Sequence, residues 1–212
     1  PFCGLRLVQC SADGVVIVAV DFQGVPAEGP EFVGNGHDVH DVFIGPVDLQ
    51  SVMVDEQGQV LQAVPRSQMR RELLRHRATY IVVENSQQQI YVQRRTLSKD
   101  YCPGLLDACC GGVVQAGESY DLSAVRELAE EMGIHHVDLV PWGTFYTEDS
   151  RSKVWGGIYS CRYEGPLSLQ AEEVEYVELM TAEQILARSE EFTPDSVVAL
   201  RHWLERRKAS GA

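Results

Sequence analysis

The sequence contains no apolar run that reaches the roughly 20 residues a membrane-spanning helix needs. Basic residues are also scarce, because 18 Lys and Arg stand against 31 Asp and Glu, for a net charge of −13. A chain this acidic has no bulk attraction for nucleic acid polymers or for anionic membrane surfaces. It contains no repeats and no low-complexity segment. We therefore expect a cytoplasmic protein that binds neither nucleic acid polymers nor membranes.

The cysteines lack the spacing of a zinc site or of a disulfide framework. We expect them to be reduced thiols that are buried like small apolar side chains, with the adjacent Cys109 and Cys110 packed in the core. The full set is Cys3, Cys10, Cys102, Cys109, Cys110 and Cys161. Asp38, His40 and Asp41 also match no ligand spacing, so a polar loop is predicted there rather than a metal site.

Composition divides the chain at about residue 47. Residues 1–46 are rich in Gly and Pro and are predicted to be an N-terminal extension of unknown role, whereas 47–212 form the predicted catalytic domain. Strands are predicted at 47–54, 60–63, 78–83, 89–95, 139–147, 153–163 and 175–180. Helices are predicted at 66–76, 121–132, 181–188 and 193–207, the last with Thr193 as its N-cap. This order predicts an α/β fold, an α/β/α sandwich with a mixed β-sheet.

The stretch from Gly112 to Ile134, which we call the box segment, carries the strongest motif of the chain. It matches the pattern G-x5-E-x7-R-E-U-x-E-E-x-G-U, where U is a bulky aliphatic residue, at every defined position. With each residue type occurring at roughly one position in fifteen, a chance match of the fixed positions has odds of about one in a million or less. The matching residues are Gly112, Glu118, Arg126, Glu127, Leu128, Glu130, Glu131, Gly133 and Ile134.

Residues 121–132 of the box segment have the pattern of an amphipathic helix, and Gly133 suits the left-handed position that ends it. The residues expected on its buried face are Leu122, Val125, Leu128, Ala129 and Met132. Glu127, Glu130 and Glu131 fall within a narrow arc that we predict to be the opposite face.

Three carboxylates near the carboxyl end of a helix repel one another and face the negative end of the helix dipole. A hard divalent cation relieves this repulsion, and oxygen ligands of this kind suit Mg²⁺, with Mn²⁺ as a substitute. The alternative is a solvated acidic helix face, which most Glu-Glu pairs represent. Because Arg126 and glycines at fixed spacing accompany the carboxylates, we favour a metal-binding catalytic helix.

The pattern of the box segment is that of the Nudix box, and the chain therefore resembles the Nudix hydrolases. The resemblance implies the α/β/α sandwich and an enzyme that cleaves a diphosphate linked to another moiety. It implies that Glu127, Glu130 and Glu131 bind the metal, and that Arg126 pairs with Glu118 or with a neighbouring box carboxylate. The catalytic residues that it implies in the segment are Glu118, Arg126, Glu127 and Glu130.

Three stretches outside the box segment carry a second resemblance. They are R-H-R-A-T at 75–79, Q-R-R-T-L-S-K at 93–99 and P-G at 103–104. They make residues 47–208 similar to type 1 isopentenyl-diphosphate isomerase and its hydrolase-like bacterial relatives. The resemblance implies that Arg95 and Lys99 bind the diphosphate, since a planar guanidinium and a mobile ammonium both suit phosphate oxygens. A solvated basic loop is the alternative. Gly112 is the third predicted substrate-binding residue, because a glycine lets the loop turn tightly near the phosphates.

An isopentenyl-diphosphate isomerase-like activity is the alternative to hydrolysis. Counting along the chain places the isomerase's catalytic Cys at Gly111, its metal-binding His at Val113 and its second catalytic Glu near Lys153. Isomerisation of an alkene needs an acid and a base on opposite faces, and two of these groups are missing. The carboxylates that hydrolysis needs are intact. We therefore predict a Mg²⁺-dependent hydrolase of a nucleoside diphosphate linked to another moiety, or of a related organic diphosphate.

The sequence leaves the general base open. It is either a box glutamate or a carboxylate of a later loop, where Glu148 and Asp149 compete with the interpretation of a plain surface turn. Trp155 either stacks on a base of the substrate or fills the core, and we favour the core. The expected partner is a small-molecule diphosphate, and a homodimer is left open. Specificity is expected to lie outside the box segment.

Overall fold

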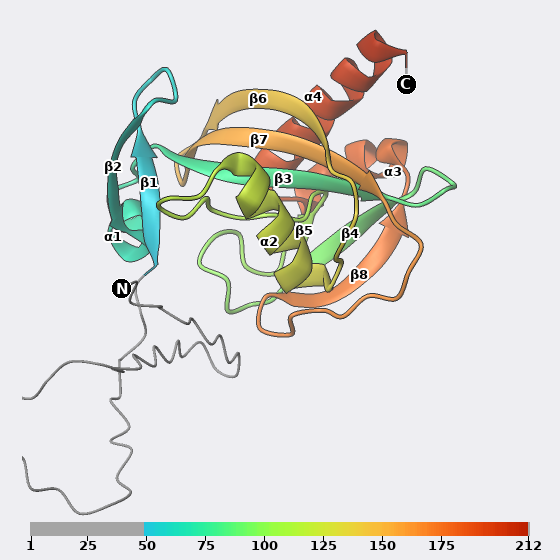
Figure 1. Cartoon of the computed structure of the whole chain (residues 1–212). Helices are drawn as coiled ribbons and strands as arrows, with labels where there is room; N and C mark the ends of the chain where they lie inside the picture. The colour runs from blue at the N-terminus through green and yellow to red at the C-terminus, as the bar shows by residue number, and fades with distance from the viewer. Residues whose placement is uncertain (1–48, 212) are drawn as a thin grey trace, which may run out of the picture. The chain divides into compact units, whose positions relative to one another are not determined.

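The computed structural model describes residues 49–211, which are built around one mixed β-sheet (Figure 1). Its central strand, β3 (His76–Glu84), is buried along nearly its whole length. It runs parallel to β7 (Lys153–Arg162) through a continuous register from His76 opposite Val154 to Glu84 opposite Arg162. A strand that is covered on both faces has to be apolar on both sides, which explains the run Tyr80-Ile81-Val82-Val83.

The other strand pairs are antiparallel and widen the sheet on both sides of this centre. The strand β4 (Ile90–Arg95) pairs with β8 (Val174–Met180) and with the short β5 (Leu106–Asp107). The strand β6 (Val140–Glu148) pairs with β7. All the predicted strands are present, whereas β5 has only two residues and shows no pattern in the sequence.

A hairpin followed by a short helix precedes the central strand. The strands β1 (Gln50–Val54) and β2 (Val60–Pro65) correspond to the strands predicted at 47–54 and 60–63 and pair antiparallel, with Gly58 at positive φ in their turn. The helix α1 (Arg66–Arg71) is shorter than the predicted span of 66–76. It stops because Leu73 adopts a φ of 50°, a left-handed conformation that no helix continues through, and the chain then extends into β3.

The box helix α2 (Tyr120–Met132) begins and ends at local signals. The Ser119 hydroxyl accepts a hydrogen bond from the backbone N–H of Leu122 at 3.2 Å, and Gly133 ends the helix at a φ of 66°. The prediction of its buried face was partly wrong. Leu122 and Val125 are 62% and 57% exposed, whereas Glu127 lies on the buried side. The face of α2 that packs on the sheet therefore includes carboxylates. They are tolerated there because they form ion pairs and hydrogen bonds within the protein.

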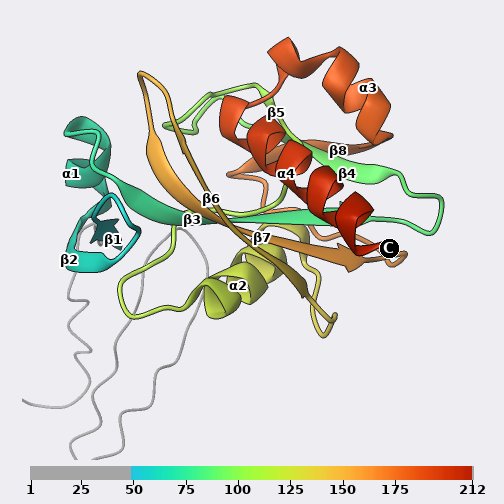
Figure 2. The same cartoon turned by 90° about the horizontal axis from the view of Figure 1, so that it is seen from above.

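Two helices cover the opposite face of the sheet (Figure 2). They are α3 (Ala182–Ala187) and α4 (Pro194–Ser210), separated by the short 3₁₀ turn η1 (Ser189–Glu191). Thr193 precedes α4 at the predicted N-cap position, but its side chain forms no capping hydrogen bond with the first turn. Its hydroxyl instead donates to the carboxylate of Asp107, so this residue joins α4 to β5 rather than satisfying the first turn.

Alternating side chains of β3 divide the core in two. Tyr80 and Val82 pack with Leu200 and Trp203 of α4, whereas Ile81 and its neighbour Val83 pack with α2. Figure 2 shows α2 on one side of the sheet and α3 and α4 on the other, which confirms the predicted α/β/α sandwich with a mixed sheet.

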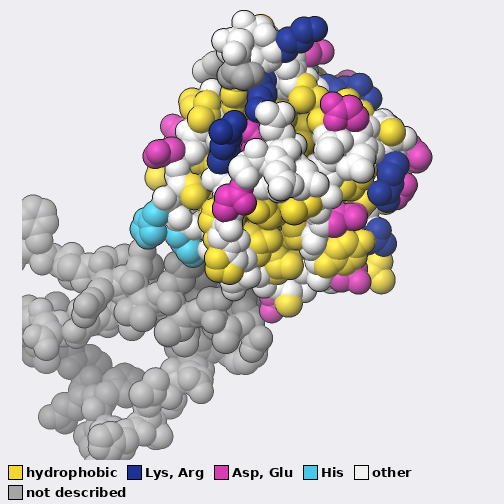
Figure 3. Space-filling view, turned by 90° about the vertical axis from the view of Figure 1, so that its right-hand side faces the viewer, with side chains coloured by type: hydrophobic (Ala, Val, Ile, Leu, Met, Phe, Trp, Pro, Cys, Tyr) yellow, Lys and Arg dark blue, Asp and Glu magenta, His cyan; other side chains and the backbone are white. Residues whose placement is uncertain are grey.

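The surface of the described part mixes charged and apolar side chains (Figure 3). On the face shown in Figure 3, acidic and basic side chains both border exposed hydrophobic ones, so neither sign of charge dominates that face. None of the helices within 49–211 combines the length and apolar character that crossing a membrane requires.

Candidate active site

The loop that enters the box segment is bonded directly to the central strand. The backbone N–H of Thr79 donates to the carbonyl of Gly112 at 2.9 Å, and that of Ile81 donates to the carbonyl of Cys110 at 2.7 Å. A Cβ on Gly112 would lie 2.7 Å from a carboxylate oxygen of Glu127. A larger residue at this position would therefore have to displace the carboxylate of the box helix, against which the loop backbone lies directly.

One arginine binds three carboxylates of the box segment. Arg126 donates to both oxygens of Glu118, at 2.7 and 2.9 Å, so the expected pairing of these two side chains is present. Its Nη1 also donates to Glu127 at 2.8 Å and to Glu130 at 2.9 Å. The rotamers of these carboxylates are fixed by this shared guanidinium, since a planar fork of donors holds its acceptors in defined directions.

Glu127 and Glu131 are buried acids on the sheet side of α2. Burial and the neighbouring charge of Glu131 raise the pKa of Glu127 to about 7, while Arg126 opposes the shift. Burial likewise raises the pKa of Glu131, against the opposing charge of Lys99. Glu131 accepts hydrogen bonds from the backbone N–H of Gly111 at 3.2 Å and from the thiol of Cys110 at 3.3 Å. Glu130 is the solvent-facing member, with 41% of its side chain exposed.

The donor set of the box suits a divalent cation. Within residues 49–211, no three His, Cys, Asp or Glu side chains converge as a preformed cage, because Arg126 holds Glu127 and Glu130 while Glu131 binds elsewhere. Two buried carboxylates that disfavour each other's charge are nevertheless the chemistry that a hard cation with oxygen preference stabilises. The residues present therefore fit the predicted type of metal.

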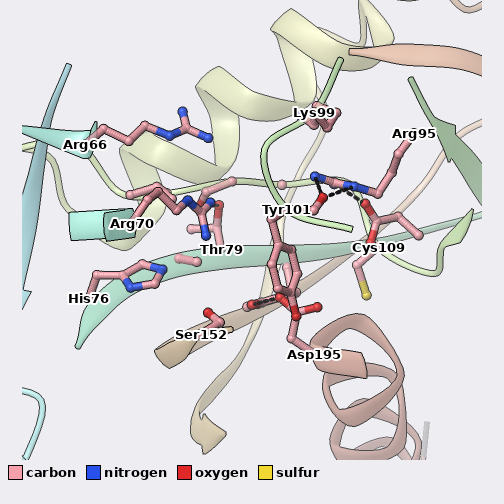
Figure 4. A pocket seen from close by; sticks show the side chains of 16 residues that line it. Arg66, Arg70, His76, Thr79, Arg95, Lys99, Tyr101, Cys109, Ser152 and Asp195 are labelled. Carbon is pink, nitrogen blue, oxygen red and sulfur yellow. Dashed lines mark hydrogen bonds and ion pairs between the residues drawn. The ribbon is translucent and has the colours of Figure 1, made fainter. Parts of the chain in front are cut away.

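A pocket of about 60 Å³ is lined by Gly111 and Gly112, and a Cβ on Gly112 would contact the carboxylate of Glu127. Its wall combines residues of α1, of β3, of the loop after β4 and of the beginning of α4. Figure 4 shows Arg66 and Arg70 on one side of this pocket and Lys99 and Arg95 on the other. The predicted substrate-binding residues Arg95, Lys99 and Gly112 thus meet at one cavity.

Arg95 and Lys99 already have partners in the protein. Arg95 donates to the carboxylate of Asp107 at 2.5 Å and to the carbonyl of Tyr101 at 2.8 and 3.0 Å. Lys99 donates to Glu173 and lies 3.6 Å from Glu131. Their positive charges are therefore shared with these carboxylates, and Lys99 connects the pocket wall to a predicted metal ligand.

Sequence reasoning missed several residues of the pocket. Arg66 and Arg70 lie in the helix predicted at 66–76, whose five basic residues give it a basic character, but no binding role is predicted for them, and Tyr80 and Asp195 carry no such prediction either. The Tyr80 hydroxyl donates to Asp195 at 2.8 Å, and burial raises the pKa of Asp195. The basic helix was the only usable signal, because Asp195 lies 115 residues from Tyr80 in the chain.

Glu148 and Trp155 lie outside this pocket. Glu148 ends β6, and its carboxylate accepts a hydrogen bond from the hydroxyl of Tyr146. The indole of Trp155 is packed between Gly58 in the β1–β2 turn and the ring of Tyr146, whose centroid is 5.5 Å away. Asp149, the other loop candidate, accepts hydrogen bonds from the backbone N–H groups of Arg151 and Ser152, which forms a local turn.

The isomerase alternative is not supported. Gly111, where the catalytic Cys would fall, has a φ of 146°, and a Cβ there would lie 2.0 Å from the carbonyl oxygen of Thr79. No side chain fits that position without a backbone shift. Cys109 and Cys110 are buried, as predicted, and belong to the two different cores of the sheet.

Comparison with known proteins places this architecture in a family. The model of the NUDIX domain matches residues 74–201, which is more than half of the chain. A Yersinia pestis protein described as an uncharacterized Nudix hydrolase is 53% identical over 154 residues, which cover 73% of this chain and 85% of that protein. The uncharacterized Nudix hydrolase YfcD of Escherichia coli is 51% identical over 154 residues, covering 73% of this chain and 86% of YfcD. The crystal structure of DR0079 from Deinococcus radiodurans superposes with a TM-score of 0.64 at 26% identity, covering 72% of this chain and 97% of DR0079.

Proposed function

We propose a specific reaction from the premise that this chain belongs to the Nudix family and is a Nudix hydrolase. The reaction is the Mg²⁺-dependent hydrolysis of a small organic diphosphate, namely a nucleoside diphosphate linked to another moiety or a related compound. The observation that carries the proposal is the buried pair Glu127 and Glu131, held beside Arg126 and beneath the Gly112 loop. Such a pair suits a cation that in turn binds diphosphate oxygens.

Glu127, Glu130 and Glu131 are the proposed metal ligands. Nudix hydrolases generally use a divalent metal, which supplies neutralisation of diphosphate charge and a lowered pKa of the attacking water. Mg²⁺ is proposed because all donors are carboxylate oxygens, and Mn²⁺ is expected to substitute for it. Gly112 leaves room for the carboxylate of Glu127, which a larger residue at this position would displace.

Arg126 and Glu118 are proposed to position the catalytic carboxylates. The guanidinium bonds Glu118, Glu127 and Glu130 at once, so it fixes their side chains before substrate arrives. For the general base we favour a box glutamate, with Glu148 as the second candidate. Neither Glu148 nor Glu130 lines the pocket. Glu130 lies on the box helix beside the other proposed ligands and is partly exposed to solvent, whereas Glu148 is bonded to Tyr146.

Arg95 and Lys99 remain the proposed contacts to the diphosphate. Both line the pocket, and a guanidinium and an ammonium there complement phosphate oxygens. Their motif is also what supports assignment of the chain to the subgroup of hydrolase-like relatives of isopentenyl-diphosphate isomerase. A small-molecule substrate agrees with the acidic composition, which disfavours a nucleic acid polymer.

The first experiment is a substrate screen with Mg²⁺ and, in parallel, with Mn²⁺. The panel contains nucleotide sugars, dinucleotides, oxidised nucleotides and prenyl diphosphates, and the readout is release of phosphate or pyrophosphate. We expect metal-dependent cleavage of at least one class. A panel that stays intact with both metals would contradict the proposed substrate class.

Glu127→Gln tests the assigned role with the substrate found in the screen. The amide keeps the shape of the carboxylate but removes its charge, so we expect a loss of hydrolysis of about a hundredfold or more from weakened metal binding. Glu205→Gln is the matched control, because its side chain on α4 is 75% exposed and far from the box segment in the chain. Full Mg²⁺-dependent turnover of Glu127→Gln would show that this role is wrong.

A further inference from the structure

The helix α1 presents two of its three arginines to the pocket. Met69 is 1% exposed and packs with Val64 and Val113, which fixes the rotation of the helix about its axis. Arg66 and Arg70 are one turn apart and line the pocket, and both guanidinium groups point into it in Figure 4. Arg71 leaves the helix in another direction, with 67% of its side chain exposed and with Glu72 as its partner.

Among residues 49–211, these two arginines differ from the other cations of the site because no carboxylate forms an ion pair with them. Arg95 and Lys99 contact Asp107, Glu131 and Glu173. The side chains of Arg66 and Arg70, in contrast, form no ion pair or hydrogen bond with any residue of 49–211. The Nε of Arg70 is buried without a hydrogen-bond partner, and the guanidinium lies 5.6 Å from the centroid of the Tyr101 ring.

An unpaired, partly buried guanidinium next to a second one is costly. Burial, followed by the charge of Arg66, lowers the pKa of Arg70, and the nearby charges of Asp100 and Asp195 offset only part of this. A bound oxyanion would satisfy the free donors and remove the repulsion between the two cations. The arrangement therefore favours an anion over a neutral or cationic group.

We infer that Arg66 and Arg70 form a subsite for a phosphoryl group of the substrate, in the pocket that Gly111 and Gly112 also line. The inference rests on the proposed function and adds to it two binding residues outside the box segment and outside the stretch 93–99. A cavity of about 60 Å³ is well below the few hundred Å³ of a whole ligand site, so it holds one small group. The guanidinium pair matches the phosphoryl group in charge and in planar donor geometry.

The test measures the binding of pyrophosphate and of inorganic phosphate to the full chain by calorimetry in metal-free buffer. The variants are Arg66→Gln and Arg70→Gln, each compared with Arg71→Gln, which removes the same charge from the same helix. Loss of a charge-assisted contact predicts an affinity for pyrophosphate that is weaker by about tenfold or more for Arg66→Gln and Arg70→Gln. Arg71→Gln is expected to stay within about twofold of the unmodified chain, because its charge is solvent-screened.

Two further measurements separate the possible causes. Unfolding midpoints of all variants are recorded, and Arg70→Lys, which keeps the charge, is expected to recover part of the affinity if folding is intact. Equal affinities for the unmodified chain, Arg66→Gln and Arg70→Gln would overturn the inference, as would the absence of any pyrophosphate binding. Because the binding measurement needs no metal and no turnover, a failure of this inference can be distinguished from a failure of the substrate screen.

Discussion

His76 is buried at the wall of the pocket, 3% exposed, and its Nδ1 donates to the carbonyl of Leu74 at 3.0 Å. Burial lowers the pKa of this imidazole to about 4, and the charges of Arg70 and Arg66 act in the same direction. The folded protein therefore keeps His76 neutral at a pH where the unfolded chain binds a proton, since a solvated histidine titrates near 6.5. Protons bind the unfolded state more strongly, so stability falls as the pH drops from about 6.5 toward about 4.

We expect His76 to contribute a loss of about 2 kcal/mol in the free energy of unfolding between pH 7 and pH 5. Urea unfolding of the native chain and of His76→Gln at both pH values measures this contribution. The change in unfolding free energy between pH 7 and pH 5 is compared between the two proteins. The difference between these changes is the contribution of His76, because the box carboxylates titrate in both proteins. Parallel pH profiles for the two proteins would contradict the assignment.

At the same scale, Gly111 shows what can be learned by counting along the chain to the position of the isomerase's catalytic Cys. The sequence placed a glycine where the isomerase carries its catalytic Cys, and the structure adds that a φ of 146° and the Thr79 carbonyl leave no room for a Cβ. Chain counting reveals which residue type is present. The steric reason came only from the pairing of the loop with β3, a contact between residues more than 30 positions apart.

At the scale of the element, α2 shows what periodicity can and cannot predict. Its ends follow from Ser119 and Gly133, which act locally and are readable in the sequence. Its buried face was partly wrong, because periodicity assigns carboxylates to solvent, whereas Glu127 and Glu131 are stabilised inside by Arg126 and by the neighbouring loop. That compensation is tertiary and has no local signature.

The corrected face of α2 leads to a prediction on stability. Leu128 is 1% exposed, so we expect Leu128→Ala to destabilise the protein by about 2–5 kcal/mol. Leu122→Ala on the same helix is the control and is expected to change stability by less than about 0.5 kcal/mol, because Leu122 is 62% exposed. Chemical denaturation followed by circular dichroism measures both. Similar losses of stability for the two variants would indicate that Leu122 is buried, as the sequence pattern predicted.

The helix α1 shows which part of the candidate site could not be predicted from the sequence. Its basic composition was visible in the sequence, but the pattern did not indicate that Arg66 and Arg70 reach the same cavity as Arg95 and Lys99. The stretch 93–99 was found through resemblance, whereas the contribution of α1 depends on how the β1–β2 hairpin packs on β3. Local pattern thus predicted the helix and missed its role.

At the scale of the whole molecule, the two larger of the three hydrophobic cores among the described residues share one sheet. The strand β3 supplies Val82 to the core under α4 and Ile81 to the core under α2, and both side chains are fully buried. Both cores pack on the same hydrogen-bonded pair of strands, β3 and β7. Unfolding of one core therefore destabilises the other. The succession of elements in the sequence predicted the helical layers on both faces of a mixed sheet, whereas the order of the strands in the sheet and the parallel β3–β7 pair could not be read from it.

We expect residues 49–211 to unfold in one cooperative transition. Leu200→Ala, on the α4 side, is predicted to lower the unfolding midpoint by the same amount in circular dichroism and in tryptophan fluorescence, to which Trp203 of that core contributes. The expected cost is about 2–5 kcal/mol. The unmodified chain serves as the reference for both probes. Separate midpoints for the two signals would show that the α4 side melts independently of the α2 side.

Cys109 and Cys110 are neighbours in the chain, yet their thiols face opposite halves of the protein, one under α4 and the other under α2. Burial raises the pKa of both thiols well above the usual value, so neither is a reactive thiolate while its side stays closed. A thiol-labelling reagent therefore modifies each only when the layer above it opens. The pair forms two native reporters, one peptide bond apart, whose labelling rates compare the breathing of the two halves within a single chain.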